Sequence, residues 1–141
     1  MVDRDIVLAK VAAIQRCLMR INQVTALDSA SLDNQDIEDI FVLNLQRAVQ
    51  AAIDLGAHVL AVEGFEIPTT LREIFSMLER HGWISAQSSR QMQNMCGFRN
   101  IAVHDYQALS KPILKAILTE HLKDLEDFYA EILSHLPSDA T

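Results

Sequence analysis

Four side chains that could take part in chemistry lie close together in residues 99–106, which read Arg-Asn-Ile-Ala-Val-His-Asp-Tyr. The guanidinium of Arg99 can hold phosphate oxygens, and the imidazole of His104 can take up or release a proton near neutral pH. Asn100 adds an amide and Tyr106 a phenol. These residue types predict chemistry on a phosphodiester. A neutral imidazole would take the proton of a ribose 2′-hydroxyl, a protonated one would protonate the leaving 5′-oxygen, and Arg99 would offset the developing charge.

The spacing of Arg99 and His104 sets a structural requirement. Positions five apart on a straight α-helix point well away from each other, whereas Asn100 and His104, four apart, share a face. We therefore expect the helix to unwind or bulge near Val103 and His104, or the site to be built by two chains around a symmetry axis. A two-fold dimer would supply two imidazoles, one as acid and one as base.

Structural roles for the same residues stay open at this point. A histidine at a helix end can stabilise the terminal carbonyls when it is charged. Arg99 could pair with Asp105 or another acid on the surface. Tyr106 could pack its ring and hydrogen-bond its hydroxyl.

The composition predicts a helical protein. The chain has 141 residues, half of them apolar and 22% charged, with four glycines and three prolines. This is enough for one domain with a core, and the low Gly and Pro content favours long helices. The net charge of −7 argues against a general nucleic-acid binder with a basic face, but it allows a local cationic pocket or cations pooled by two chains.

Capping residues and apolar periodicity divide the chain into about five helices. We expect them over residues 3–27, 34–62, 70–81, from 85 into the 99–106 cluster, and 110–136. Short connections between long amphipathic helices predict an all-α up-and-down bundle. The expected domain is 1–137, with a frayed tail at 138–141. The acidic segment 33–39 would help to start the second helix or face a basic partner, and Trp83 fits either an exposed anchor or a core residue.

Several other classes of protein find no support. No secretory signal or membrane-length apolar run is present, and Cys17 and Cys96 are far apart, so we expect reduced thiols in a cytoplasmic protein. His-Glu-x-x-His and paired Glu-x-x-His motifs are absent, as are glycine-rich nucleotide loops. We therefore expect no metal and no cofactor.

The pattern Arg-x-x-x-x-His-x-Tyr, at Arg99, His104 and Tyr106, resembles the signature of HEPN-domain ribonucleases. Asn100 also fits the polar residue commonly seen after the arginine. The similarity is closest to the HepT-like toxins of HEPN/MNT modules. It extends through the length, the early pair of long helices, the Thr70 capping segment and the Gly82-Trp83-Ile84 turn, and covers the chain up to about Leu136.

This resemblance implies a bundle that dimerises and joins two motifs in one cleft. It implies metal-independent cleavage of tRNA or mRNA by a toxin, with Arg99 and His104 catalytic and Asn100 assisting. The implied partner is a nucleotidyltransferase-fold (MNT) antitoxin, which would silence the toxin by attaching AMP to Tyr106 or by occluding the site. The alternative is a non-catalytic HEPN bundle that holds substrate or nucleotide for a nucleotidyltransferase. The intact Arg99/His104 pair favours the nuclease.

Overall fold

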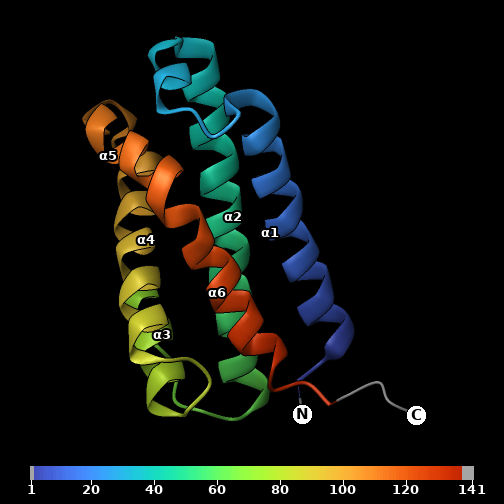
Figure 1. The fold of residues 1–141 in the computed structure, drawn as a ribbon. Helices are drawn as coiled ribbons and strands as arrows, with labels where there is room; N and C mark the ends of the chain where they lie inside the picture. Colours follow the sequence, from blue (N-terminus) through green and yellow to red (C-terminus); the bar gives the residue numbers. More distant parts are fainter. Residues whose placement is uncertain (1, 138–141) are drawn as a thin grey trace.

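Two long antiparallel helices, α1 (Arg4–Thr25) and α2 (Gln35–Val62), form one side and the centre of the bundle in the computed structural model (Figure 1). The side chain of Asp3 caps α1 by accepting backbone N–H groups of its first turn, and Asn34 does the same for α2. A 3₁₀ turn, Ser29–Asp33, connects the two helices where the turn-forming residues predicted a break.

A second antiparallel pair, α3 (Leu71–Arg80) and α4 (Ala86–His104), packs beside α2 (Figure 1). The predicted caps are confirmed: the hydroxyl of Thr70 accepts the amide of Glu73 at 3.1 Å, and that of Ser85 begins α4. The helix α4 runs uninterrupted from the base of the bundle to the cluster at residues 99–106 and ends at its histidine. The position of that cluster is thus fixed by the length of α4.

The last part of the chain differs from the expected single helix over 110–136. It forms α5 (Lys111–Ala116), a π turn (Ile117–His121) and α6 (Leu122–Leu133), and it ends three residues early. A π turn accommodates an extra residue in a helix and changes the direction in which the following side chains point. Neither glycine nor proline lies between residues 113 and 133 to signal the change.

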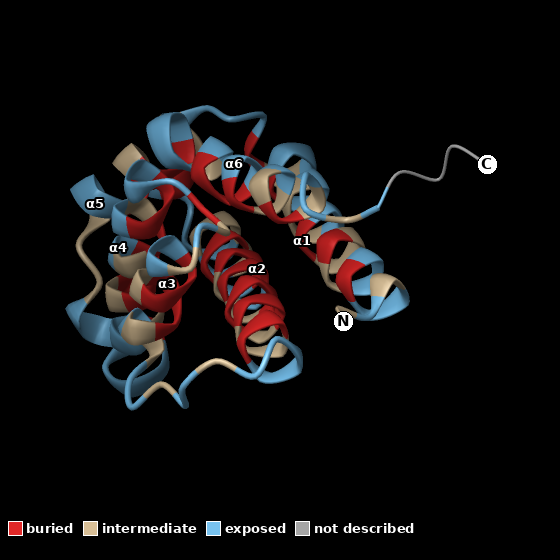
Figure 2. Ribbon diagram, turned by 90° about the horizontal axis from the view of Figure 1, so that it is seen from below, coloured by how far each residue is buried: buried red, intermediate tan, exposed pale blue. Residues whose placement is uncertain are grey.

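The core surrounds α2, whose buried residues run along its length from Phe41 to Leu60 (Figure 2). Large apolar side chains from the other helices pack against it, and Phe75 of α3 meets Phe128 of α6 edge to face with 5.4 Å between ring centroids. Trp83 is half-buried against this core and contacts the ring of His135, with centroids 4.3 Å apart. It is therefore a core-edge residue and not an exposed anchor.

The structure describes residues 2–137, and the expected tail at 138–141 lies outside this range. Every regular element within the described range is helical, which confirms the predicted all-α bundle of about five helices. None of its helices combines the length and the apolar character that crossing a membrane requires.

Candidate functional site

Arg99 is held on the face of α4 that meets α2. Its Nε donates to Oε1 of Gln50 on α2 at 3.3 Å, and its Nη1 donates to Oδ1 of Asn100 at 3.3 Å. Gln50 in turn donates to Asp54 at 2.9 Å, and Asp54 lies 3.4 Å from the ammonium of Lys10 on α1. A chain of polar contacts therefore links α1, α2 and α4 and fixes the guanidinium.

The partners of Arg99 are neutral amides. No carboxylate pairs with it among residues 2–137, so the expected alternative of an ion pair with Asp105 or another acid is wrong for the described chain. An arginine has five N–H donors in a rigid fork, and the two bonds leave donors available on both terminal nitrogens. The positive charge of Arg99 is therefore positioned but not neutralised, as the binding of a phosphate requires.

His104 is the last residue of α4, and its side chain is exposed. The imidazole makes no hydrogen bond or ion pair within the described residues. Asp105 then leaves the helix with φ −151° and ψ 67°, while its amide still donates to the carbonyl of Ile101 at 2.8 Å. The imidazole thus stands at a helix end, open to solvent.

The helix remains regular between Arg99 and His104, so of the two expected arrangements the unwinding or bulge at Val103 and His104 is not found, and the site shared by two chains stays a prediction. Five residues of α-helix turn the two side chains about 140° apart. Arg99 faces α2, and His104 faces away from it. Within one chain the structure does not bring the two groups together. Asn100 lies beside Arg99 and holds its guanidinium.

Tyr106 follows in a short 3₁₀ turn, Tyr106–Ala108, with 41% of its surface exposed. Its hydroxyl donates to Oδ1 of Asp39 at 2.6 Å, and the amide of Gln35 donates to the same oxygen at 2.8 Å. Burial, followed by the bond to Asp39, raises the pKa of Tyr106 well above its ordinary value. The same two hydrogen bonds lower the pKa of Asp39. The phenol is therefore kept neutral and bound to the start of α2.

The acidic segment 33–39 has a role that the sequence left open. It supplies negative charge to the first turn of α2, as predicted. It also holds the chain that follows the motif. In addition to the bond between Asp39 and Tyr106, Glu38 lies 3.8 Å from Lys111 and Asp33 lies 3.0 Å from Lys115. Three polar contacts therefore fasten residues 106–115 to the top of α2.

Sequence reasoning did not connect Gln50 or Asp39 of α2 with the motif, to which they are hydrogen-bonded, although Asp39 lies in the acidic segment 33–39. These contacts depend on how α2 pairs with α4, which no local pattern reveals. The thiols also lie where helices meet: Cys96 is buried and Cys17 half-buried, and neither forms a disulfide. Burial raises the pKa of Cys96 to about 11, although Arg72 and Arg99 oppose the shift. Cys96 is therefore a core thiol and not a nucleophile.

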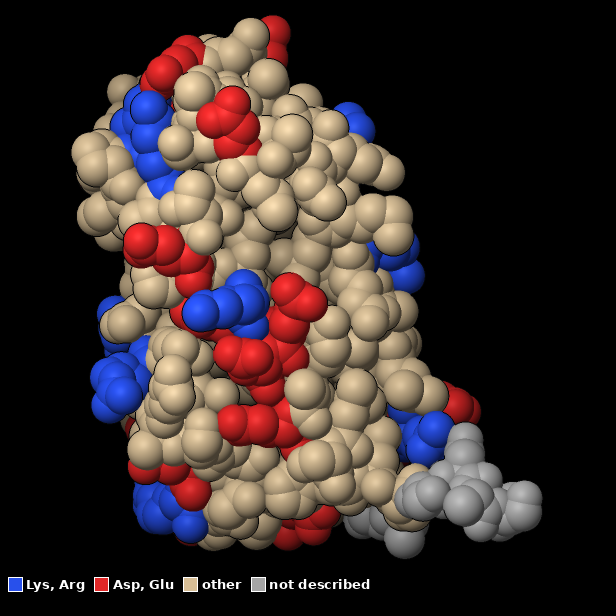
Figure 3. All heavy atoms as spheres, viewed as in Figure 1, with Lys and Arg blue, Asp and Glu red and all other residues tan. Residues whose placement is uncertain are grey.

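Charge is unevenly spread over the surface. On the face seen in Figure 3, acidic atoms form a strip along the middle, over α6, and most basic atoms lie toward the edges. This face offers no continuous basic track for a nucleic-acid backbone. Among the described residues, no group of three or more His, Cys, Asp or Glu side chains is arranged to hold a metal.

Comparisons with known proteins agree with this geometry. A sequence model of the ribonuclease HepT-like family matches residues 14–132. The chain is 38% identical over 124 residues to the mRNA nuclease HepT of Shewanella oneidensis, covering 88% of this chain and 93% of that protein.

Solved structures show the same similarity. A toxin–antitoxin crystal structure with AMP-PNP superposes with a TM-score of 0.89 at 35% identity, covering 94% of this chain and all of that one. A tri-AMPylated HEPN toxin of Shewanella oneidensis, in complex with MNT antitoxin, gives a TM-score of 0.88 at 36% identity with the same coverage. The chain therefore belongs to the ribonuclease HepT-like family.

Proposed function

We propose that this protein is the toxin of a toxin–antitoxin pair and acts as a metal-independent endoribonuclease on mRNA or tRNA. Two protomers related by a two-fold axis join their motifs into one cleft. Arg99 binds the scissile phosphate, His104 transfers protons, and Asn100 supports the guanidinium. The free thiols of Cys17 and Cys96 support a cytoplasmic location.

The observation that carries this proposal is the contrast between a fixed, unneutralised guanidinium and an open imidazole. Arg99 is oriented by neutral partners, and His104 stands exposed at the end of the same helix. Because the two side chains diverge by about 140° on one helix, a second protomer is needed to bring an arginine and a histidine to one phosphate.

The reaction follows from this arrangement. One His104 takes the proton of the 2′-hydroxyl, whose oxygen attacks phosphorus and forms a new P–O bond. The P–O5′ bond breaks, and His104 of the second protomer gives its proton to the departing 5′-oxygen. Arg99 stabilises the charge on the pentacovalent phosphate. The products are a 2′,3′-cyclic phosphate and a 5′-hydroxyl end.

The antitoxin partner acts at Tyr106. A nucleotidyltransferase would join the Tyr106 oxygen to the α-phosphorus of ATP, with loss of pyrophosphate. Asp39 already accepts the hydroxyl hydrogen at 2.6 Å and is placed to take the proton. The adduct would put negative charge and bulk beside the motif, where RNA phosphate must enter. The related HEPN toxin that is described as tri-AMPylated supports this proposal. Inhibition by occlusion alone would instead leave the mass of the toxin unchanged.

The test is RNA cleavage by the purified protein in EDTA. We expect cleavage to persist in EDTA and His104→Ala to abolish both cleavage and growth inhibition. His135→Ala, at an exposed histidine near the end of the described chain, should retain both cleavage and growth inhibition. Undiminished cleavage by His104→Ala would overturn the mechanism. A wild-type protein that cuts no RNA but binds a nucleotidyltransferase would favour the non-catalytic alternative.

A further inference from the structure

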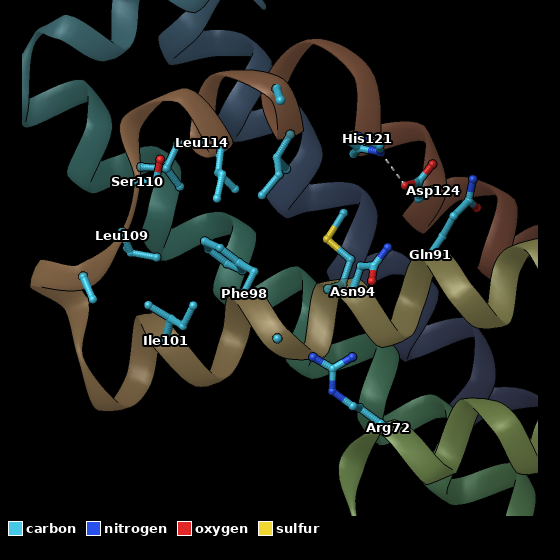
Figure 4. Close-up of a pocket in the computed structure, with 16 residues that line it drawn as sticks. Arg72, Gln91, Asn94, Phe98, Ile101, Leu109, Ser110, Leu114, His121 and Asp124 are labelled. Carbon is cyan, nitrogen blue, oxygen red and sulfur yellow. Dashed lines mark hydrogen bonds and ion pairs between the residues drawn. The ribbon is translucent and has the colours of Figure 1, made fainter.

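A groove of about 380 Å³ lies between α4 on one side and α5, the π turn and α6 on the other (Figure 4). Apolar side chains form most of its walls, among them Phe98 and Ile101 of α4 and Leu114 of α5. The groove does not include Arg99, His104 or Tyr106. It shares α4 with the motif, and it is not explained by the reaction described above.

One polar group in this groove lacks a partner. Asp124 lines it and is only 2% exposed, and its Oδ2 lies 3.0 Å from Nδ1 of His121. Its Oδ1 is buried and has no hydrogen-bond partner within residues 2–137. A buried acceptor without a donor is costly, because it has lost its bonds to water and gained none in return. Such a group calls for an explanation, and a ligand that donates to it would supply one.

The π turn is what brings this pair to the groove. It ends at His121, and Asp124 follows in the first turn of α6. Interruptions of this kind cost regular hydrogen bonding and occur frequently at functional sites. An irregular helical turn and an unpartnered buried carboxylate therefore lie at the same place in the groove.

A cation stands at the other side of the groove. The guanidinium of Arg72 lies across α4 at Gly97, so close that a Cβ built there would meet its Nη2 at 2.6 Å. Arg72 forms no ion pair with an acid among residues 2–137, since the salt bridges found there involve other residues. The groove thus combines apolar walls, a carboxylate that needs a donor and a guanidinium that can take an anion.

We propose that this groove is a nucleobase subsite for the RNA substrate, with Asp124 selecting guanine and Arg72 holding an adjacent phosphate. The inference rests on the proposed ribonuclease function and names the base that the site prefers. Single-stranded RNA is recognised by packing splayed bases on apolar and aromatic side chains and by bonding their Watson–Crick edges. Phe98 and Ile101 offer the packing surface, and Asp124 offers the acceptor.

Guanine fits the acceptor better than the other bases. Its N1–H and N2–H₂ groups are neighbouring donors that match the two oxygens of one carboxylate once the buried Asp124 side chain turns toward the groove. Each oxygen has two lone pairs, so Oδ2 can still bond His121. Adenine and cytosine present one amino group beside an acceptor. Uracil presents one N–H between two carbonyl oxygens, which a carboxylate repels.

The groove runs along α4 toward the cleaved bond. At 1.5 Å per residue, its lining residues Ile101, Asn94 and Gln91 lie about 4.5, 15 and 20 Å along the helix axis from His104, which is a span of a few nucleotides. A protein segment fits the groove less well, although Ile101 and Ile113 on the rim are 43% and 59% exposed. An apolar helix in the groove would offer no hydrogen-bond donor to Asp124 and no anion to Arg72. A nucleotide supplies both.

Nucleotide binding to the His104→Ala dimer tests this directly, because it needs no cleavage. By isothermal titration calorimetry we expect 5′-GMP to bind at least tenfold more tightly than 5′-UMP. Asp124→Asn, which preserves shape, should remove that preference, and Asp127→Asn on the same helix should retain it. No saturable binding, a preference below tenfold, or one that survives Asp124→Asn would overturn the proposal.

Two further variants cover the remaining outcomes. Arg72→Gln, at an exposed position that does not endanger folding, should weaken all four monophosphates several-fold without changing their order, while Arg90→Gln should not. Ile113→Asp tests for a protein occupant. If it separates the dimer or abolishes antitoxin binding and leaves GMP affinity unchanged, the groove is an interface and the proposal fails.

Cleavage mapping separates this inference from the proposed function. If the wild-type protein cuts RNA, its sites should carry guanine at a fixed position within a few nucleotides of the broken bond, and Asp124→Asn should relax that preference. Cleavage without any base preference overturns the subsite and leaves the nuclease intact. GMP-selective binding by a protein that cuts no RNA would support the subsite and contradict the proposed nuclease activity.

Discussion

The two halves of the motif are held in opposite ways. Arg99 lies inside α4, where Gln50 and Asn100 fix its guanidinium and a chain of contacts extends to Lys10 on α1. His104 ends the helix, exposed and without a partner in the described chain. On the proposed mechanism, the fold of one protomer therefore preorganises the half that binds phosphate and leaves the half that transfers protons to be completed by a second protomer and the RNA.

The largest effect on RNA cleavage is expected from a change at Arg99, and it tests whether the fixed guanidinium matters. Arg99→Lys keeps the charge but cannot bond Gln50 and phosphate together, because an ammonium lacks the planar fork. We expect RNA cleavage to fall by about 10²–10³-fold, as when a transition-state donor is lost. Arg90→Lys, on an exposed part of α4, should cleave normally. Near-normal cleavage by Arg99→Lys would show that charge alone suffices and that the preorganisation is unimportant.

Gln50 tests whether the neutrality of the partner matters. Gln50→Glu would place a carboxylate on Arg99 and neutralise it before RNA arrives. We expect cleavage to fall roughly tenfold, equivalent to about 1.4 kcal/mol. The thermal unfolding midpoint should be unchanged or slightly lowered, because the new carboxylate gains an ion pair with Arg99 but replaces the hydrogen bond to Asp54 with repulsion. Gln15→Glu adds the same charge at an exposed site on α1 and should leave cleavage unchanged. A Gln50→Glu protein that is fully active would mean that Arg99 does not bind phosphate.

The hydrogen bond between Asp39 and Tyr106 lies on the His104 side of the motif, and its contribution to stability should depend on pH. The pKa of Tyr106 is raised from 10.0, so the contribution of its neutral form to stability is complete below pH 10 and is lost at more alkaline pH. The pKa of Asp39 is lowered from 3.8, so its contribution is present above that pH and is lost on acidification. The stability difference between wild type and Asp39→Asn should therefore be flat between these limits.

Denaturant unfolding at several pH values measures that difference. Tyr106→Phe removes the same hydrogen bond from the other side, so the double variant should be no less stable than the more affected single variant. A difference that grows below pH 3.8 would contradict the bond. Co-expression with the antitoxin adds a second readout. Asp39→Asn should slow the gain of AMP mass if Asp39 takes the Tyr106 proton.

The same contrast explains what could be predicted from the sequence. Helix ends marked by Asp3, Asn34, Thr70 and Ser85 were predictable, because capping is local chemistry. The five-residue spacing already implied that Arg99 and His104 diverge. Of the two arrangements that this spacing allows, the distortion at Val103 and His104 is absent, since nothing in the helix opposes regular bonding up to His104, and the site shared by two chains stays a prediction.

What could not be predicted depends on contacts between helices. Gln50 and Asp39 acquire their roles only when α2 lies against α4, across 49 and 67 residues of chain. The π turn at Ile117–His121 has no glycine or proline to mark it, so apolar periodicity merges α5 and α6 into one helix. The unpartnered Asp124 follows from that turn and was missed with it.

The smallest effect on stability is expected at the ion pair between Lys115 and Asp33, which lies beyond His104 and Tyr106 in the chain. Lys115 lies 3.0 Å from Asp33, but 63% of the Asp33 side chain is exposed, and exposed ion pairs contribute little to stability. Lys115→Met should therefore change the free energy of unfolding only slightly, and the change should shrink further in high salt. Chemical denaturation in low and high salt checks both points, with Lys123→Met as the control. If Lys115→Met instead lowers cleavage as much as Gln50→Glu does, the segment after His104 is positioned by its own protomer. The His104 side of the motif would then be preorganised as well, and the contrast between a fixed Arg99 and an open His104 would not hold.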